Sequence, residues 1–175
     1  MLVLGIDPGT ATTGYGFVKF LNSEAEVLDY GLIETLKDSS PEARLASIYS
    51  ELSNILLKFK PDIVAVEKLF FATNVKTATR VGQACGVILL SAAQARIPVY
   101  EYAPGEIKKA IAGNGRADKI AMQKAVRLLL GAGIRKKKGK KTHFDNAADA
   151  LAVALCHGHK EASIDFSVNG GDNNE

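Results

Sequence analysis

Three acidic residues lie in apolar surroundings, where carboxylates are uncommon. Asp7 and Glu67 each end a short apolar run, and Asp149 interrupts a stretch of small and apolar residues. An unpaired buried carboxylate is unfavourable, so such a side chain normally has a cation or a metal ion beside it. Each acid alone is equally compatible with a turn, a helix cap or a surface salt bridge. Taken together, the three acids favour a metal site.

The donor atoms of such a site would all be oxygens. Oxygen ligands suit Mg²⁺ or Mn²⁺ better than zinc. Two such ions, ~4 Å apart, can activate a water molecule and stabilise the leaving oxygen of a phosphodiester. Asp145 and Asn146 precede Asp149 by about one helical turn, so either side chain could face the same point.

Two apolar runs must bring Asp7 and Glu67 together. Residues 2–6, followed by the Asp-Pro-Gly turn, predict one buried strand, and residues 63–67 predict a second. A helix over 41–60, with a serine cap and a proline in its first turn, is long enough to cross between parallel strands. With that crossover, both acids emerge at the same edge of the sheet.

The other elements follow from similar patterns. Residues 13–20 and 26–35 predict two further strands, and because they follow the first strand directly, this half of the sheet is expected to be antiparallel. The remaining predicted elements are helices over 73–95, 104–112, 117–130 and 145–160, a strand over 97–100 and a loop over 131–143.

Two glycines lie four residues apart inside the predicted helix 73–95. Glycine inside a helix costs ~1 kcal/mol, so Gly82 and Gly86 indicate close packing on one face of the helix. The partner of that face is either the sheet or a second subunit, and the sequence leaves both open.

The composition is that of one globular domain. Of the 175 residues, 47% are apolar and 23% are charged, and residues 1–160 are long enough to bury a core. Cys85 and Cys156 have no metal-ligand spacing, so both are predicted to be buried free thiols in a reducing compartment. The N-terminus enters a strand without a signal sequence, and no stretch reaches ~20 apolar residues, so we expect a cytoplasmic protein.

Charge is unevenly distributed along the chain. All 22 Lys and Arg residues lie in residues 1–160, whereas residues 161–175 contain four acids. A basic body with a polar acidic tail, which we expect to be disordered, is compatible with a polyanionic partner. Six of the seven residues at 135–141 are basic, and the run directly precedes the helix with Asp149, which favours phosphate contact over a solvated loop.

Several motifs, in order along residues 1–160, resemble the RuvC Holliday-junction resolvases. They are GIDPGT at 5–10, AVEKLFFATN at 65–74, GQACG at 82–86, EYAPGEIKKAIAGNGRADK at 101–119 and NAADALAVALCH at 146–157. The resemblance implies a ribonuclease H-like fold, a homodimer, and Mg²⁺-dependent paired nicking of four-way DNA junctions. By motif position it makes Asp7, Glu67 and Asp149 catalytic acids, with Asp7 bridging two ions.

The chain departs from the family pattern at one position. The family usually has an acid, sometimes a histidine, where Asn146 stands, three residues before Asp149. Asparagine can ligate a metal through its carbonyl oxygen but brings no charge. Asp145 or His143 could substitute, or the change could be a deliberate inactivation. The sequence leaves these readings open.

The resemblance also implies how DNA is bound. It makes Lys108 and Lys119 the basic residues near the scissile phosphate, and Phe70 a side chain that stacks on an unpaired base, with Phe71 beside it. Lys124 lies near these lysines. The other predicted phosphate contacts are Lys109, Arg116, Arg135, Lys136, Lys137, Lys138, Lys140 and Lys141.

The expected protein is therefore an α/β nuclease. We expect a mixed five-stranded sheet in the order 3-2-1-4-5 flanked by helices, a dimer, and the RuvA–RuvB branch-migration complex as a possible partner. Two other functions remain: a non-catalytic or weakly active junction-binding protein, because of Asn146, and a fragment of an actin-like or sugar-kinase-type ATPase, because of the strand-Asp-x-Gly-Thr start.

Overall fold

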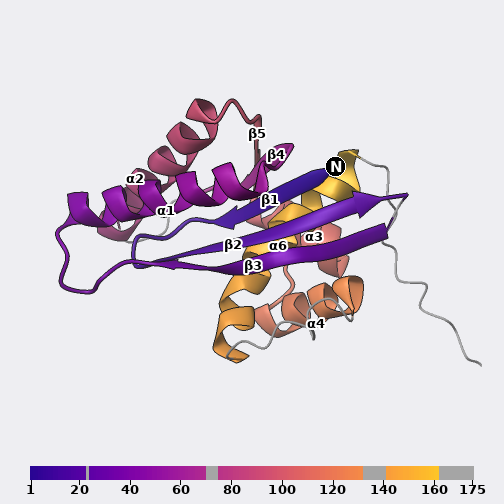
Figure 1. The fold of residues 1–175 in the computed structure, drawn as a ribbon. Coiled ribbons are helices and arrows are strands. Elements are labelled where there is room, and N and C mark those ends of the chain that lie inside the picture. Colours follow the sequence, from indigo (N-terminus) through magenta and orange to yellow (C-terminus); the bar gives the residue numbers. More distant parts are fainter. Residues whose placement is uncertain (23, 70–74, 132–140, 162–175) are drawn as a thin grey trace, which may run out of the picture.

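The structure is a computed structural model that describes residues 1–22, 24–69, 75–131 and 141–161 (Figure 1). Five strands and five helices lie in these residues. The strands are β1 (Leu2–Asp7), β2 (Thr12–Leu21), β3 (Glu24–Glu34), β4 (Ile63–Glu67) and β5 (Val99–Tyr102). The helices are α1 (Pro41–Phe59), α2 (Val75–Gln94), α3 (Pro104–Ala112), α4 (Lys119–Leu130) and α6 (Lys141–Glu161). Of the tail predicted at 161–175, Glu161 is instead the last residue of α6, and residues 162–175 lie outside the described residues.

The strands form one mixed sheet in the order β3-β2-β1-β4-β5, which confirms the predicted order. β1, β2 and β3 are antiparallel neighbours, as expected of strands that follow one another directly. β4 is parallel to β1, and β5 is parallel to β4. Helix α1 makes the crossover from the antiparallel half to β4, so the predicted role of residues 41–60 is confirmed.

Helices cover both faces of this sheet. α1 and α2 lie on one face, and α3, α4 and α6 lie on the other (Figure 1). Successive side chains of a strand point to opposite faces, and β1 shows this clearly. Leu4 and Ile6 are buried against α1 and α2, whereas Val3 belongs to the core under α6.

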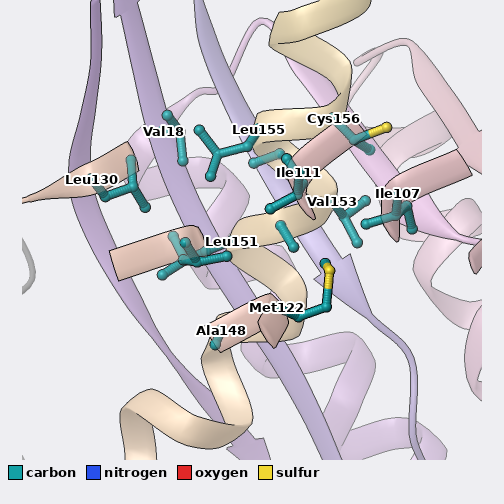
Figure 2. Close-up of a cluster of buried hydrophobic side chains, with 14 of the residues drawn as sticks. Val18, Ile107, Ile111, Met122, Leu130, Ala148, Leu151, Val153, Leu155 and Cys156 are labelled. Carbon is teal, nitrogen blue, oxygen red and sulfur yellow. The ribbon is translucent and has the colours of Figure 1, made fainter. Parts of the chain in front are cut away.

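The core under α6 is built on close approach of a helix to the strands (Figure 2). Residues 147–155 of α6 are small or apolar, apart from Asp149, and Leu151 and Leu155 are fully buried. A Cβ atom added to Gly5 would collide with the carbonyl oxygen of Ala150 and lie 2.6 Å from the backbone nitrogen of Ala154. Glycine at this position lets the backbone of α6 lie directly on β1.

Local capping explains where two helices begin. The Ser40 hydroxyl accepts a hydrogen bond from the Ala43 amide at the start of α1, as the serine cap predicts. α4 was predicted to begin at residue 117, but Asp118 is the cap and its carboxylate accepts from the Ala121 amide at 2.8 Å. The helix therefore begins at Lys119.

Two further predicted boundaries are wrong. The strand expected at 97–100 lies at Val99–Tyr102, because the Ile97 amide bonds to the Ala92 carbonyl and closes the end of α2. The helix expected at 145–160 begins at Lys141. The end of the predicted loop at 131–143 is thus helical.

The burial of α2 shows which side of the helix Gly86 faces. Ala84, Cys85 and Ile88 face the sheet and are buried. Gly86 lies on the exposed side, and a Cβ added there would meet no atom within 4 Å. The alternative that both glycines pack on the sheet is wrong for Gly86.

Two other sequence predictions concern the cysteines and membrane-spanning segments. Cys85 and Cys156 are free and buried, as expected. Among the helices that the structure describes, none has the length and apolar character needed to cross a membrane.

Candidate active site

The sheet register brings two of the predicted acids to one edge. β1 and β4 are parallel with Ile6 beside Val66, so Asp7 and Glu67 follow at the same end of adjacent strands. Val3 and Ala65 belong to the core under α6. Asp7 and Glu67 lie an even number of residues further along their strands, so they face α6 as well.

Helix α6 supplies the third acid to the same place. Asp149 directly precedes Ala150, whose carbonyl oxygen lies against Gly5, two residues before Asp7. The close approach at Gly5 therefore holds Asp149 near the end of β1. The charge on Asp149 raises the pKa of both Asp7 and Glu67, so the three carboxylates form one electrostatic group.

Burial and mutual repulsion perturb these acids strongly. Burial, followed by the charge on Asp149, raises the pKa of Asp7 to about 6, against an opposing effect of Lys119. Burial, followed by the charges on Asp7 and Asp149, raises the pKa of Glu67 to about 7, against Lys108. Strongly raised carboxyl pKa values in a pocket are typical of functional sites.

Two lysines border the acids. The Lys119 ammonium lies 3.6 Å from Asp149 Oδ2, with 59% of the lysine side chain exposed. Lys108 from α3 and Lys119 from α4 line one pocket of about 240 Å³ together with Glu67 and Asp149. Its other walls are Pro104, Ile107, Met122 and Ala152. Negative and positive groups thus face a common solvent-accessible space.

The donor set fits a hard divalent cation. Asp7, Glu67 and Asp149 offer only carboxylate oxygens, which Mg²⁺ and Mn²⁺ prefer. Within the described part of the chain, no three acidic, histidine or cysteine side chains are close enough to hold one ion as they lie. Repulsion between the carboxylates of Asp7, Glu67 and Asp149 favours their separation. A cation between them would favour their approach, since opposite charge stabilises the ionised carboxylates.

The remaining predicted site residues have different places. Lys109 on α3, Arg116 before α4 and Lys124 on α4 are exposed, and none of them lines the pocket. Asp145, Asn146, Lys141 and His143 belong to α6, but their side chains lie outside the described residues. So do Phe70, Phe71, Arg135, Lys136, Lys137, Lys138 and Lys140.

Sequence reasoning missed the apolar walls of the pocket. Met122 is buried and lines the pocket together with Glu67 and Asp149, and Pro104 begins the helix that carries Lys108. Met122 belongs to the apolar stripe of α4, which also includes Val126 and Leu130. That helical spacing was the available signal, but it shows burial without showing what is buried beside it.

The chain is similar to proteins of one family. A family model described as crossover junction endodeoxyribonuclease RuvC matches residues 3–157. Proteins of that description from Caldicellulosiruptor saccharolyticus and Chloroflexus aurantiacus are 47% and 48% identical to it over 165 and 164 residues. Each similarity covers 94% of this chain and 96% of the relative.

Solved structures agree with this result. Thermus thermophilus RuvC is 34% identical, with a TM-score of 0.79 over 94% of this chain and 98% of that one. The same protein in complex with a Holliday junction substrate is 32% identical, again with a TM-score of 0.79 and the same coverage. The yeast mitochondrial Holliday junction resolvase Ydc2, at 16% identity and a TM-score of 0.68 over 93% of this chain and 81% of that one, shares the fold.

Proposed function

The chain belongs to the RuvC family of crossover junction endodeoxyribonucleases, and we propose that Asp7, Glu67 and Asp149 form the metal-dependent site with which it cuts four-way DNA junctions. The observation that supports the assignment is the register of β1 and β4 under α6, which places Asp7 and Glu67 at the same end of adjacent strands, beside a pocket that Glu67 and Asp149 line. Resolution of Holliday junctions is the function that the relatives support.

The acidic and the basic residues of the site would have different roles. Asp7, Glu67 and Asp149 would hold Mg²⁺, with Mn²⁺ as the alternative, and Asn146 or Asp145 would add an oxygen ligand from α6. Bound divalent ions supply Lewis acidity, which lowers the pKa of a bound water and stabilises a leaving oxygen. Lys108 and Lys119 place positive charge beside the acids, where a phosphate would otherwise be repelled. Exposed Lys109 and Arg116 extend this charge along the DNA.

Cutting two strands of one junction calls for two such sites. We propose that a homodimer supplies them and that the exposed side of α2 forms the interface. Gly86 is open on that side, and Leu90, one turn later, is 52% exposed. A glycine without neighbours beside an exposed leucine is what a second helix needs for close contact. A twofold arrangement then makes the two nicks symmetric.

The other expectations from the sequence remain proposals. Phe70 and Phe71 would stack on unpaired bases, and the basic run 135–141 would contact phosphates. The residues after Glu161 would form a tail separate from the nuclease domain, and the RuvA–RuvB complex would supply junctions in the cytoplasm. Of the competing functions, neither a non-catalytic junction binder nor an ATPase fragment is favoured by relatives that are named as endonucleases.

The decisive experiment compares a four-way junction with a linear duplex of matched sequence, in Mg²⁺, in Mn²⁺ and in EDTA. We expect paired, symmetric nicks on the junction alone and only with a metal.

Asp7→Asn, which removes one charge at nearly constant volume, should bind the junction without cutting it. Cleavage that survives in Asp7→Asn would remove the acids from the mechanism. Tight binding without nicks in either metal would favour the non-catalytic reading, and Asn146→Asp would then be tested for recovery.

A further inference from the structure

A second hollow lies on the face of the sheet opposite the three acids. It has a volume of about 250 Å³ and is lined from four segments of the chain. Thr10 comes from the turn after β1, Lys37 and Ser39 come from the loop before α1, and the helices contribute Arg44 and Arg80. Pro41, Leu45 and Gln83 complete the lining. We call these eight residues the basic hollow.

The basic hollow adjoins the edge of the sheet that carries the catalytic acids. Thr10 follows Asp7 by three residues, so the turn after β1 connects the acid at the end of β1 to the lining of the basic hollow. The loop before α1 and the first turns of α2 lie at the same end of the sheet (Figure 1). Lys108 and Lys119 stand on the α6 side of this edge, and the basic hollow stands on the α1 and α2 side.

The charge of the basic hollow is positive and fixed in place. Its lining includes three cations and no acid. Arg44 is half-buried, and its guanidinium donates to the backbone carbonyls of Ser39 and Lys37, which hold its position without neutralising its charge. Lys37 and Arg80 are exposed, and no described acidic side chain forms an ion pair with them.

The lining chemistry selects one class of ligand. No aromatic side chain lines the basic hollow, so it offers no surface on which a base could stack. Cations with hydroxyl and amide groups nearby are the usual contacts of backbone phosphates. Arg44 and Arg80 can each present paired N–H donors to phosphate oxygens. The basic hollow therefore fits the sugar-phosphate backbone and offers no aromatic surface for stacking on a base.

We propose that the basic hollow binds a backbone phosphate of the junction DNA beyond the cut, on the side of the sheet away from Lys108 and Lys119. The proposal rests on the proposed function, since it places DNA across the sheet edge at Asp7. A strand that crosses this edge is then held by cations on both sides of the acids, which positions the bond to be cut. This phosphate contact does not depend on the DNA sequence.

The test is the salt dependence of junction binding, measured by fluorescence anisotropy in an Asp7→Asn background that prevents cutting. Lys37→Gln and Arg80→Gln are combined, and Arg44 is left intact because it holds the loop. The control combines Lys19→Gln and Lys58→Gln, which remove the same charge from exposed positions. Lys19 pairs with Leu2, at the opposite end of β1 from Asp7.

We expect the hollow variant to bind the junction about 10-fold more weakly at low salt, with a slope of log K against log[salt] shallower by about 1, as for one lost phosphate contact. The control should match the parent. Equal binding by the hollow variant and the parent would overturn the proposal and leave the basic hollow to an acidic protein segment. An equal loss in both variants would overturn it too, since net charge would explain the effect.

The junction-cutting activity and phosphate binding in the basic hollow can be excluded separately. If the unmodified protein does not cut four-way junctions, the proposed function fails. If it cuts them, and the hollow variant binds like the control, only the basic hollow is excluded. Melting temperatures of the variants show whether each is folded, and both altered side chains are exposed, so folding should be retained.

Discussion

Gly5 of β1 and Ala150 of α6 lie in direct backbone contact, with no space between them for a side chain. The contact joins the first strand of the chain to its last described helix. Asp7 lies two residues after Gly5, and Asp149 lies one residue before Ala150. The distance between Asp7 and Asp149 therefore depends on the absence of a single methyl group.

Gly5→Ala should destabilise the protein and impair cleavage together. The added Cβ would collide with Ala150 and stand 2.6 Å from the Ala154 nitrogen, so α6 must shift away from β1. Overpacking of this kind costs about 1–3 kcal/mol, which urea denaturation can measure. The control is Gly105→Ala in the first turn of α3, where no atom lies within 4 Å. It should be neutral or more stable by about 0.4–1 kcal/mol. Equal stability of the two variants would contradict the close approach.

The stability of the metal-free protein should fall as pH rises from about 4 to about 7. The pKa of Asp7 rises from 3.8 to about 6 on folding, and that of Glu67 rises from 4.5 to about 7. The folded state therefore holds protons that the unfolded chain has already released, which favours folding only at low pH. Thermal melting in EDTA across this range measures the loss.

Two additions sharpen the pH measurement. Asp7→Asn should flatten the dependence, because that side chain no longer ionises. Mg²⁺ should raise the melting temperature more at pH 8 than at pH 5, since it competes with protons for the carboxylates. A Mg²⁺ effect that is the same at both pH values would argue against ligation by Asp7 and Glu67.

Lys119→Met should lower the cleavage rate about 10²-fold and leave the fold intact. The ammonium lies 3.6 Å from Asp149, yet the side chain is 59% exposed, so its loss removes charge with little packing. Lys119 also opposes the rise in the pKa of Asp7, so the acid side of the pH–rate profile should move to higher pH. Single-turnover cleavage measures both effects. Lys19→Met is the control, and a rate equal to that of the control would remove Lys119 from the site.

Leu90→Glu should convert the proposed dimer into monomers. It places a charge on the exposed side of α2, one turn after Gly86. Light scattering after size exclusion measures the mass, and the junction assay should lose paired nicks while single nicks persist. Leu128→Glu, on an exposed position of α4 that is 64% accessible, controls for the added charge. A dimer that survives in Leu90→Glu places the interface elsewhere.

The sequence best predicts the positions of the two acids that end strands, Asp7 and Glu67. Asp7 and Glu67 end short apolar runs joined by a helix of crossover length, and those facts alone imply parallel neighbours with their acids at one edge. Asp149 was suspected because a charge stands in an apolar helix. Its position beside Asp7 depends on Gly5, and a contact between residues so far apart leaves no local pattern.

Other features depend on groups that meet only in the folded chain. The ion pair between Lys119 and Asp149 joins two helices, and the raised pKa of Glu67 needs both its burial and its two acidic neighbours. The start of α6 at Lys141 was missed because the basic run before it was interpreted as a loop. Four segments make the basic hollow, so no single stretch of sequence indicates it.

Helix α6 contacts all five strands and is the last described element of the chain. During translation, this face of the sheet therefore stays incompletely covered until residues 141–161 have left the ribosome. Asp149 arrives with the same helix that completes the core. A nascent or truncated chain that ends before Lys141 lacks part of this core and lacks Asp149, so under the proposed function it would not cut DNA.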